Sequence, residues 1–469
     1  MASHYKDNKL VFSSIFYYNG FIIWPYRLVA RTPPSHGGNR GSIPLKATKI
    51  KNMFELLAPS GSFKKMKFAF EYGADAVYMG LPDFSLRARL NDYNIESVYE
   101  SIDYAHKIGK KVYLTFNIFA HNSHIKNLEN SSEIKKFLSS SSAPDAVICS
   151  DPGIILWMSE NFPKIDIHLS TQMNTLNYKA VEFWKKFGVK RIILGRECTL
   201  EDIIIIKKEI PDIEIEYFVH GSMCMAYSGR CFLSKFFLNK SANLGECTHP
   251  CRFPWKKVAE IENEEIPRQI LLEEDEKGSY FFSSYDMCMI ENMKELVLAG
   301  VDSFKIEGRT KSVFYVSSVA KAYRDVLNNI DSSSLSEIVE YNKNELEKLV
   351  SRGYTSGFLH DEAKVNPSNV SNIREESGYR FVGEVVLKDE KSIFDENNNY
   401  VLVHNKIISG FEIEVVLKKG RNLNLKVEKI IDPDTGDEMS EISSGYEKVV
   451  ILVFDKDIKL EEMTLLISK

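Results

Sequence analysis

The stretch IEIEYFVHGSMCMAYSGRCFLS, residues 213 to 234, contains a clear strand pattern followed by two cysteines. Apolar residues recur at every second position from Ile213 to Val219, which predicts a β-strand. The strand runs into a turn at Gly221. A strand that ends in such a turn presents its last side chains at the carboxyl edge of a sheet, where α/β enzymes carry their chemistry. We therefore expect the functional site to surround this turn.

Five of the seven cysteines fall in one stretch of the chain, and they are Cys224, Cys231, Cys247, Cys251 and Cys288. Their spacing lacks the paired C-x2-C units of zinc ribbons and has no histidine half-site. Thiolates gathered from separated loops favour an iron–sulfur cluster, while structural zinc and unligated thiols remain the alternatives. Disulfides are disfavoured because nothing places this part of the chain in an oxidising compartment.

Length and composition indicate an ordinary globular protein. The chain has 469 residues, of which 44% are hydrophobic and 27% charged, and this length suffices for two or three domains. The net charge of −5 excludes a generally basic nucleic-acid binder. Any RNA site would have to be a local patch.

Short apolar runs alternate with amphipathic stretches from residue 55 onward, which is typical of parallel β/α architecture. The predicted strands are residues 55–59, 76–80, 111–117, 146–150, 167–171, 191–195, 213–219 and 303–308. The predicted helices include residues 94–108, 179–187, 200–210 and 286–299, and two more follow at 313–328 and 335–351. Eight strands with interposed helices predict an α/β fold with a TIM-type barrel. An open doubly wound sheet is the alternative, although no G-x-G-x-x-G turn follows the first strand.

The chain divides by pattern into a barrel and a second, smaller domain. The barrel is expected over residues 53–352, with an inserted hairpin near 256–283 that is either a lid or a tolerated surface insertion. Residues 353–376 have the composition of a linker. From 377 to 469 the period changes to two, which predicts a small antiparallel β-barrel. Its turns carry Lys418, Lys419 and Arg421, which suggests a substrate-gripping accessory.

Residues 1 to 52 show neither helical nor strand periodicity, so we expect a non-core extension. A targeting segment is one interpretation, because acidic residues are scarce there. The apolar run from Phe21 to Trp24 is too short to span a bilayer. The alternative is an upstream tRNA gene read through in frame, since GNRGSIPL back-translates to a sequence like a tRNA T arm. Met53 would then be the true start.

The segment from 216 to 234 resembles the signature of the collagenase-like peptidase family, E-x-F-x2-G-S-hydrophobic-C-x4-G-x-C-x-L-S. The matching residues are Glu216, Phe218, Gly221, Ser222, Cys224, Gly229, Cys231 and Ser234. Further similar blocks are residues 56–62, 116–122, 145–153, 167–174, 196–203, 286–290 and 304–312, so the resemblance covers about residues 53 to 469.

The best understood relatives in this family are oxygen-independent hydroxylases rather than proteases. The chain is most similar to the branch that uses prephenate to hydroxylate the wobble uridine of tRNA. The resemblance therefore implies a cytoplasmic enzyme that forms 5-hydroxyuridine in tRNA, with a 4Fe-4S cluster, prephenate as dicarboxylate co-substrate, tRNA as partner and no membrane. The alternatives are a collagenase-like peptidase and a related hydroxylase of ribosomal RNA or of a quinone precursor.

Residues at the carboxyl ends of the predicted strands would converge on one mouth of the barrel. The candidate substrate-binding residues are Asn117, Ser170, Gln172, Arg196, Glu197 and Arg309, and the candidate catalytic residues are His220 and Glu307. The two arginines could each bind a carboxylate through two hydrogen bonds, and the two amides could bind a base or a ring hydroxyl.

Structural roles are open for three of these residues. Glu197 and Glu307 could simply form ion pairs with the arginines, and His220 could be a hydrogen-bonded histidine rather than a proton carrier. A peptidase would need a nucleophile and a base, but G-x-S-x-G, H-E-x-x-H and C-G-S-C-W are absent from the sequence. A cysteine nucleophile stays possible, because Cys224 follows His220 by four residues.

The expected cluster ligands are Cys224, Cys231, Cys247 and Cys288, with Cys251 as the alternative fourth. Cys288 is expected to open the helix before the eighth strand, which would bring it to the mouth of the barrel. Cys251 is only four residues from Cys247 and is therefore the second choice.

Overall fold

A computed structural model describes residues 54–81, 84–86, 93–224, 226–252, 284–360, 377–388, 392–443 and 448–469, together with three short strands near the N-terminus. These strands are β1 (Phe16–Tyr18), β2 (Phe21–Trp24) and β3 (Arg27–Leu28), and they form an antiparallel sheet. They lie in the region whose sequence shows no strand periodicity, because strands this short leave no visible period in the sequence. The chain divides into two units, Met1–Ile50 and Lys51–Lys469. The predicted hairpin near 256–283 lies outside the described residues, as do residues 361–376 of the predicted linker.

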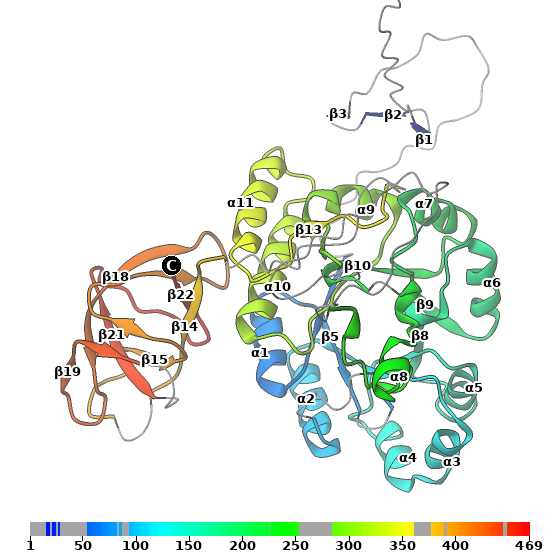
Figure 1. Cartoon of the computed structure of the whole chain (residues 1–469), viewed down its shortest axis with the longest axis horizontal. Coiled ribbons are helices and arrows are strands. Elements are labelled where there is room, and N and C mark those ends of the chain that lie inside the picture. Colours follow the sequence, from blue (N-terminus) through cyan, green and yellow to red (C-terminus); the bar gives the residue numbers. More distant parts are fainter. Residues whose placement is uncertain are drawn as a thin grey trace, which may run out of the picture. The chain divides into compact units, whose positions relative to one another are not determined.

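Eight parallel strands close into a barrel in the second unit, as predicted (Figure 1). They are β4 (Glu55–Pro59), β5 (Ala76–Gly80), β6 (Lys111–Phe116), β7 (Ala146–Cys149), β8 (Asp166–Leu169), β9 (Val189–Ile193), β10 (Glu214–Ser222) and β12 (Ser303–Ile306). Each pairs with the next, and β12 pairs with both β10 and β4. This double pairing closes the sheet, so the open doubly wound alternative is wrong.

Helices surround the barrel on its outer side (Figure 1). They are α1 (Phe63–Glu71), α2 (Ile95–Lys107), α3 (Asn122–Asn130), α4 (Ser132–Leu138), α5 (Pro152–Asn161), α6 (Tyr178–Lys186), α7 (Leu200–Glu209), α9 (Met293–Ala299), α10 (Val313–Asn328) and α11 (Leu335–Glu347). Polar N-caps fix several of their starts: the Thr199 hydroxyl, for example, accepts a hydrogen bond from the Asp202 amide at the start of α7. No helix among the described residues has the length and apolar character needed to cross a membrane.

The stretch from residue 286 differs from the predicted helix. Its first three residues form strand β11 (Asp286–Cys288), and α9 begins only at Met293. Strand β11 pairs antiparallel with the last residues of β10, which extend beyond the pairing with β12. On its other side it pairs with β13 (Tyr354–Thr355), so the first part of the predicted linker is ordered strand. The unpaired end of β10 thus supplies hydrogen-bond partners that override the local helical pattern.

The C-terminal domain is the predicted antiparallel barrel. Its strands are β14 (Arg380–Val385), β15 (Asn399–Val403), β17 (Glu412–Val416), β18 (Leu423–Ile431), β21 (Val449–Phe454) and β22 (Leu465–Ser468), with short additions at β16 (Ile407–Ile408), β19 (Glu438–Met439) and β20 (Glu441–Ile442). Pairing of β17 with β18 closes the ring. Most of its buried apolar residues form a core cluster of their own, while Val416, Leu465 and Ile467 belong to the core cluster of the larger barrel.

Candidate functional site

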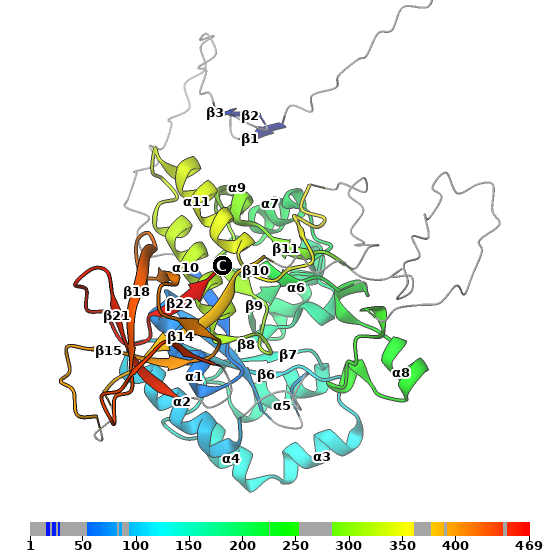
Figure 2. The ribbon, with the colours of Figure 1, turned by 60° about the vertical axis from the view of Figure 1, so that its left-hand side comes forward.

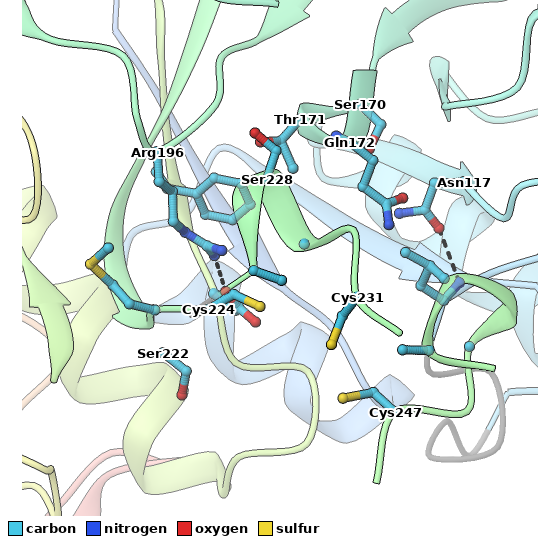
Figure 3. Close-up of a pocket in the computed structure, with 18 of the residues that line it drawn as sticks. Asn117, Ser170, Thr171, Gln172, Arg196, Ser222, Cys224, Ser228, Cys231 and Cys247 are labelled. Carbon is cyan, nitrogen blue, oxygen red and sulfur yellow. Dashed lines mark hydrogen bonds and ion pairs between the residues drawn. The ribbon is translucent and has the colours of Figure 1, made fainter. Parts of the chain in front are cut away.

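A cavity of about 190 Å³ opens at the carboxyl ends of the barrel strands. Residues of β5, β6, β7, β9, β10 and β12 line it, together with the turn after β8 and the loop that follows β10 (Figure 3). In a TIM-type barrel this end carries the chemistry. Most of the predicted site residues lie on its wall: Asn117, Ser170, Gln172, Arg196, Glu307 and Arg309.

Four of the five clustered cysteines line this cavity, namely Cys224, Cys231, Cys247 and Cys251. None of these four cysteines forms a disulfide within the described part of the chain. Figure 3 shows the sulfur atoms of Cys231 and Cys247 turned toward each other across one side of the cavity. The donor set therefore suits a thiolate-bound cluster. In the described part of the chain, however, no three His, Cys, Asp or Glu side chains are drawn together tightly enough to hold a single metal ion.

Cys288 occupies a different position, because β11 is a strand. It pairs with His220 across the ladder and is absent from the cavity lining. The Tyr323 hydroxyl lies 3.7 Å from its sulfur, and burial raises the pKa of the Cys288 thiol to about 11. The structure thus brings the alternative residue, Cys251, to the cavity rather than Cys288.

Two side-chain amides face the cavity side by side (Figure 3). The Asn117 carbonyl oxygen accepts a hydrogen bond from the Leu86 amide at 3.0 Å, and the Gln172 carbonyl oxygen accepts one from the Ser150 hydroxyl at 3.0 Å. With their oxygens engaged, both residues can offer NH₂ donors to a ligand. Ser170 caps the 3₁₀ turn that carries Gln172.

Arg196 forms an ion pair with Glu307, and its guanidinium stacks over the Phe218 ring with 4.1 Å between the guanidinium carbon and the ring centroid. Glu197 has a different partner, since it accepts hydrogen bonds from the amide and hydroxyl of Ser228 at 2.6 and 2.7 Å. Glu307 is therefore ion-paired in the way considered from the sequence, whereas Glu197 shapes the loop after β10.

Arg309 is buried, and its guanidinium donates to the Ser85 and Thr115 hydroxyls at 2.9 and 3.3 Å and to the Leu86 carbonyl. These hydrogen bonds hold the loop after β5 against the barrel. Arg309 contacts the cavity, but much of its hydrogen-bonding capacity is used within the protein.

His220 lies outside the cavity lining. It is buried among Tyr315, Tyr323 and Tyr354, and its Nδ1 is 3.3 Å from the Tyr323 hydroxyl. Burial lowers the pKa of His220 to about 3, so the ring is neutral near pH 7. This is the arrangement of a hydrogen-bonded structural histidine, and it does not bring His220 to Cys224.

Lys305, a buried lysine that lines the cavity, is not among the site residues predicted from the sequence. Its ammonium binds Glu216 at 2.7 Å and lies 4.4 Å from the Tyr78 ring centroid. Glu216 also accepts from Arg191 at 3.2 Å. Burial lowers the pKa of Lys305, and Glu216 opposes this effect. A lysine inside a four-residue buried strand was the available signal in the sequence.

Comparison with known families gives two matches along the chain. The family described as peptidase family U32 matches residues 61–369, and the C-terminal domain described for the same family matches residues 377–466. The division between the two matches agrees with the two barrels of the structure.

Individual relatives extend this similarity over most of the chain. "tRNA hydroxylation protein P" of Haemophilus influenzae is 38% identical over 453 residues, covering 87% of this chain and 94% of the relative. The protein of the same name from Escherichia coli is 36% identical and covers 87% of this chain and 95% of the relative. The "23S rRNA 5-hydroxycytidine C2501 synthase" of E. coli is 32% identical over 60% of this chain and 40% of its own length.

Proposed function

Because the chain belongs to peptidase family U32, and because its cavity carries amide donors and thiols, we propose that it is a hydroxylase of tRNA. The proposed product is 5-hydroxyuridine at the wobble position, with prephenate required and molecular oxygen not used. Relatives named for tRNA hydroxylation, similar along both barrels, support the substrate class.

The main structural support for the proposal is the pair of side-chain amides on the cavity wall. Uracil presents two carbonyl oxygens, and Asn117 and Gln172 can each offer an NH₂ donor to one of them. Enzymes that modify a base in RNA bind it unstacked in a pocket and recognise its hydrogen-bonding edge. Ser170 supports this role by holding the turn that carries Gln172.

The thiols would hold an iron–sulfur cluster with four irons. We propose Cys224, Cys231 and Cys247 as ligands, with Cys288 or Cys251 as the fourth. When bound, such a cluster supplies electrons or a Lewis-acid iron to the reaction. Two observations support the assignment: none of the five cysteines forms a disulfide within the described residues, and four of them, Cys224, Cys231, Cys247 and Cys251, line one cavity.

Arg196 would bind a carboxylate of the co-substrate. Its guanidinium is held by Glu307 and the Phe218 ring, which limits its motion and leaves little entropy to lose on binding. Arg309, which also lines the cavity, would contribute its charge while it fixes the loop after β5.

The His220–Cys224 pair considered for the peptidase alternative lacks support in this geometry. A cysteine protease needs a base within hydrogen-bonding reach of its thiol, and His220 is instead buried against Tyr323, outside the cavity that Cys224 lines.

Nucleoside analysis of a deletion strain tests the proposal. Bulk tRNA from that strain should lose 5-hydroxyuridine and its derivatives, and wild-type protein should restore them, while the hydroxycytidine of ribosomal RNA stays unchanged. Unchanged tRNA nucleosides would overturn the tRNA role. Cleavage of gelatin by purified protein, abolished by Cys224→Ser, would establish the peptidase function instead.

A further inference from the structure

The short helix α8 (Leu233–Leu238) exposes aromatic side chains beside the cavity. Phe232, directly before it, is 77% exposed, and Phe236 is 81% exposed. Figure 2 shows α8, in green, outside the ring of barrel helices. We infer that Phe232 and Phe236, here called the α8 aromatic pair, form a stacking platform for bases of a single-stranded RNA loop. The inference rests on the proposed function and deepens it.

The charge around the platform suits a polyanion. Residues 217 to 245 contain no aspartate or glutamate, but they contain Arg230, Lys235 and Lys240. The whole protein carries a net charge of −5, so this stretch of sequence differs in charge from the chain as a whole. Cationic side chains interleaved with exposed aromatic rings are the combination that binds single-stranded nucleic acid. An apolar protein partner would not require the cations.

The platform is tied to the cavity wall. Its neighbours Cys231 and Leu233 line the cavity, and α8 packs against the turns η4 (Ala242–Leu244) and η5 (Pro250–Arg252). The buried Ser234 hydroxyl accepts hydrogen bonds from the Thr248 amide and hydroxyl at 3.2 and 3.3 Å. These contacts join α8 to the loop that carries Cys247 and Cys251. The exposed rings therefore lie at a fixed place on the rim.

A base that enters the cavity must leave its stack, and its neighbours in the loop then lose a stacking partner. Exposed aromatic rings on the rim can replace that partner, because every base has a π face. Amides in the cavity would recognise the target base, while the α8 aromatic pair would hold the flanking bases without sequence preference.

A second exposed pair of phenylalanines provides a matched control. Phe183 on α6 and Phe187, directly after it, are 51% and 52% exposed and contact each other with 4.9 Å between ring centroids. Neither lines the cavity. Their replacement removes a similar apolar surface from the outside of the barrel.

The experiment measures binding of a fluorescein-labelled anticodon stem–loop by fluorescence anisotropy with full-length protein at fixed salt. The double variant Phe232→Ala/Phe236→Ala should raise the Kd at least about tenfold, given the usual loss per stacked base. Phe183→Ala/Phe187→Ala should change it by less than about twofold. Phe236→Trp should retain binding, whereas Phe236→Leu, equally apolar but not planar, should not. Circular dichroism melts of the Phe232 and Phe236 variants should be unchanged, since both side chains are largely exposed.

The salt dependence of RNA binding separates the contribution of the lysines from that of the α8 aromatic pair. Lys235→Gln/Lys240→Gln should make the negative slope of log K against log salt less steep by about 1.4, the value for two phosphate contacts to a single strand. The Phe variants should leave this slope unchanged.

Two results distinguish this inference from the proposed function. Wild-type and α8 variants that bind the loop equally would overturn the platform, even if tRNA from the deletion strain lacks 5-hydroxyuridine. Loss of binding in the α8 variants alone, combined with unchanged tRNA nucleosides, would support the platform and overturn the tRNA hydroxylase. Failure of the wild-type protein to bind any loop RNA would overturn the platform.

Discussion

Arg196 and Arg309 were predicted from the sequence as equivalent carboxylate binders, but they have different surroundings. Arg196 pairs with one carboxylate and stacks on one ring, whereas Arg309 donates to two hydroxyls and a backbone carbonyl. Lysine keeps the charge of arginine and loses its planar fork. The same conservative substitution should therefore act differently at the two positions.

Arg196→Lys should raise the KM for the dicarboxylate co-substrate roughly tenfold or more, because a charge-assisted hydrogen bond contributes about 1.5–3 kcal/mol. Its Kd for tRNA should hardly change. Arg309→Lys should instead lower the free energy of unfolding by about 1–3 kcal/mol, measured in urea, because buried hydroxyl and carbonyl partners lose their donor. If Arg196→Lys weakened co-substrate binding and tRNA binding equally, the result would contradict a specific role in binding the co-substrate. Arg196 would then have only the structural role of its ion pair.

Single substitutions also identify the fourth ligand of the proposed cluster. Cys251→Ser and Cys288→Ser, each purified without oxygen, should differ in iron content: the variant that lacks the true ligand should lose most of the roughly four irons per chain, and the other should keep them. Iron and acid-labile sulfide are measured on both, with Cys149→Ser, a buried cysteine outside the cavity, as control. A colourless wild-type protein with one zinc would contradict the cluster.

Among the helices, α10 is buried on most of its surface, and it carries a lysine into that buried surface. Lys321 binds the Asn422 side chain in the turn between β17 and β18. Burial lowers the pKa of Lys321 to about 8, while Glu345, Asp325 and Glu414 oppose the shift. An element that joins the two barrels thus contains a group whose protonation is linked to folding.

The sign of this linkage is set by the lowered pKa. As pH falls from 10.5 to 8, the unfolded chain takes up the proton before the folded protein, so the free energy of unfolding should fall, by up to roughly 3 kcal/mol. Below pH 8 this group should contribute no further change. Lys321→Met should remove that part of the slope, measured as the difference between the two proteins in urea unfolding from pH 8 to 10.5. Parallel curves would contradict the burial of the charge.

At the scale of the whole molecule, Met1–Ile50 forms a unit separate from Lys51–Lys469, and the buried core of the barrel includes residues from Leu56 onward. Deletion of residues 1–52 should therefore leave the melting temperature within about 2 °C, since a change of ~1 kcal/mol shifts a protein of this size by about that much or less. Differential scanning calorimetry checks this, and activity should persist. A drop of many degrees would show that the segment packs on the barrel.

The sequence by itself determined both barrels. Strand and helix periods are local, and eight apolar runs separated by amphipathic segments admit a closed parallel barrel, which the double pairing of β12 confirms. The positions of Asn117, Gln172 and Arg196 also followed from the sequence, because residues at the ends of parallel strands must meet at one mouth.

Only the tertiary structure decided which partners those residues have. Asp286–Cys288 became a strand because the end of β10 lacked a neighbour, and this moved Cys288 away from the cavity. Lys305 faces Glu216, and His220 faces Tyr323, through contacts between segments far apart in the chain. The periodicity of apolar residues along a strand or helix predicts which face of that element is buried. The register and closure of the barrel determine what that face meets, and these depend on pairing between distant strands.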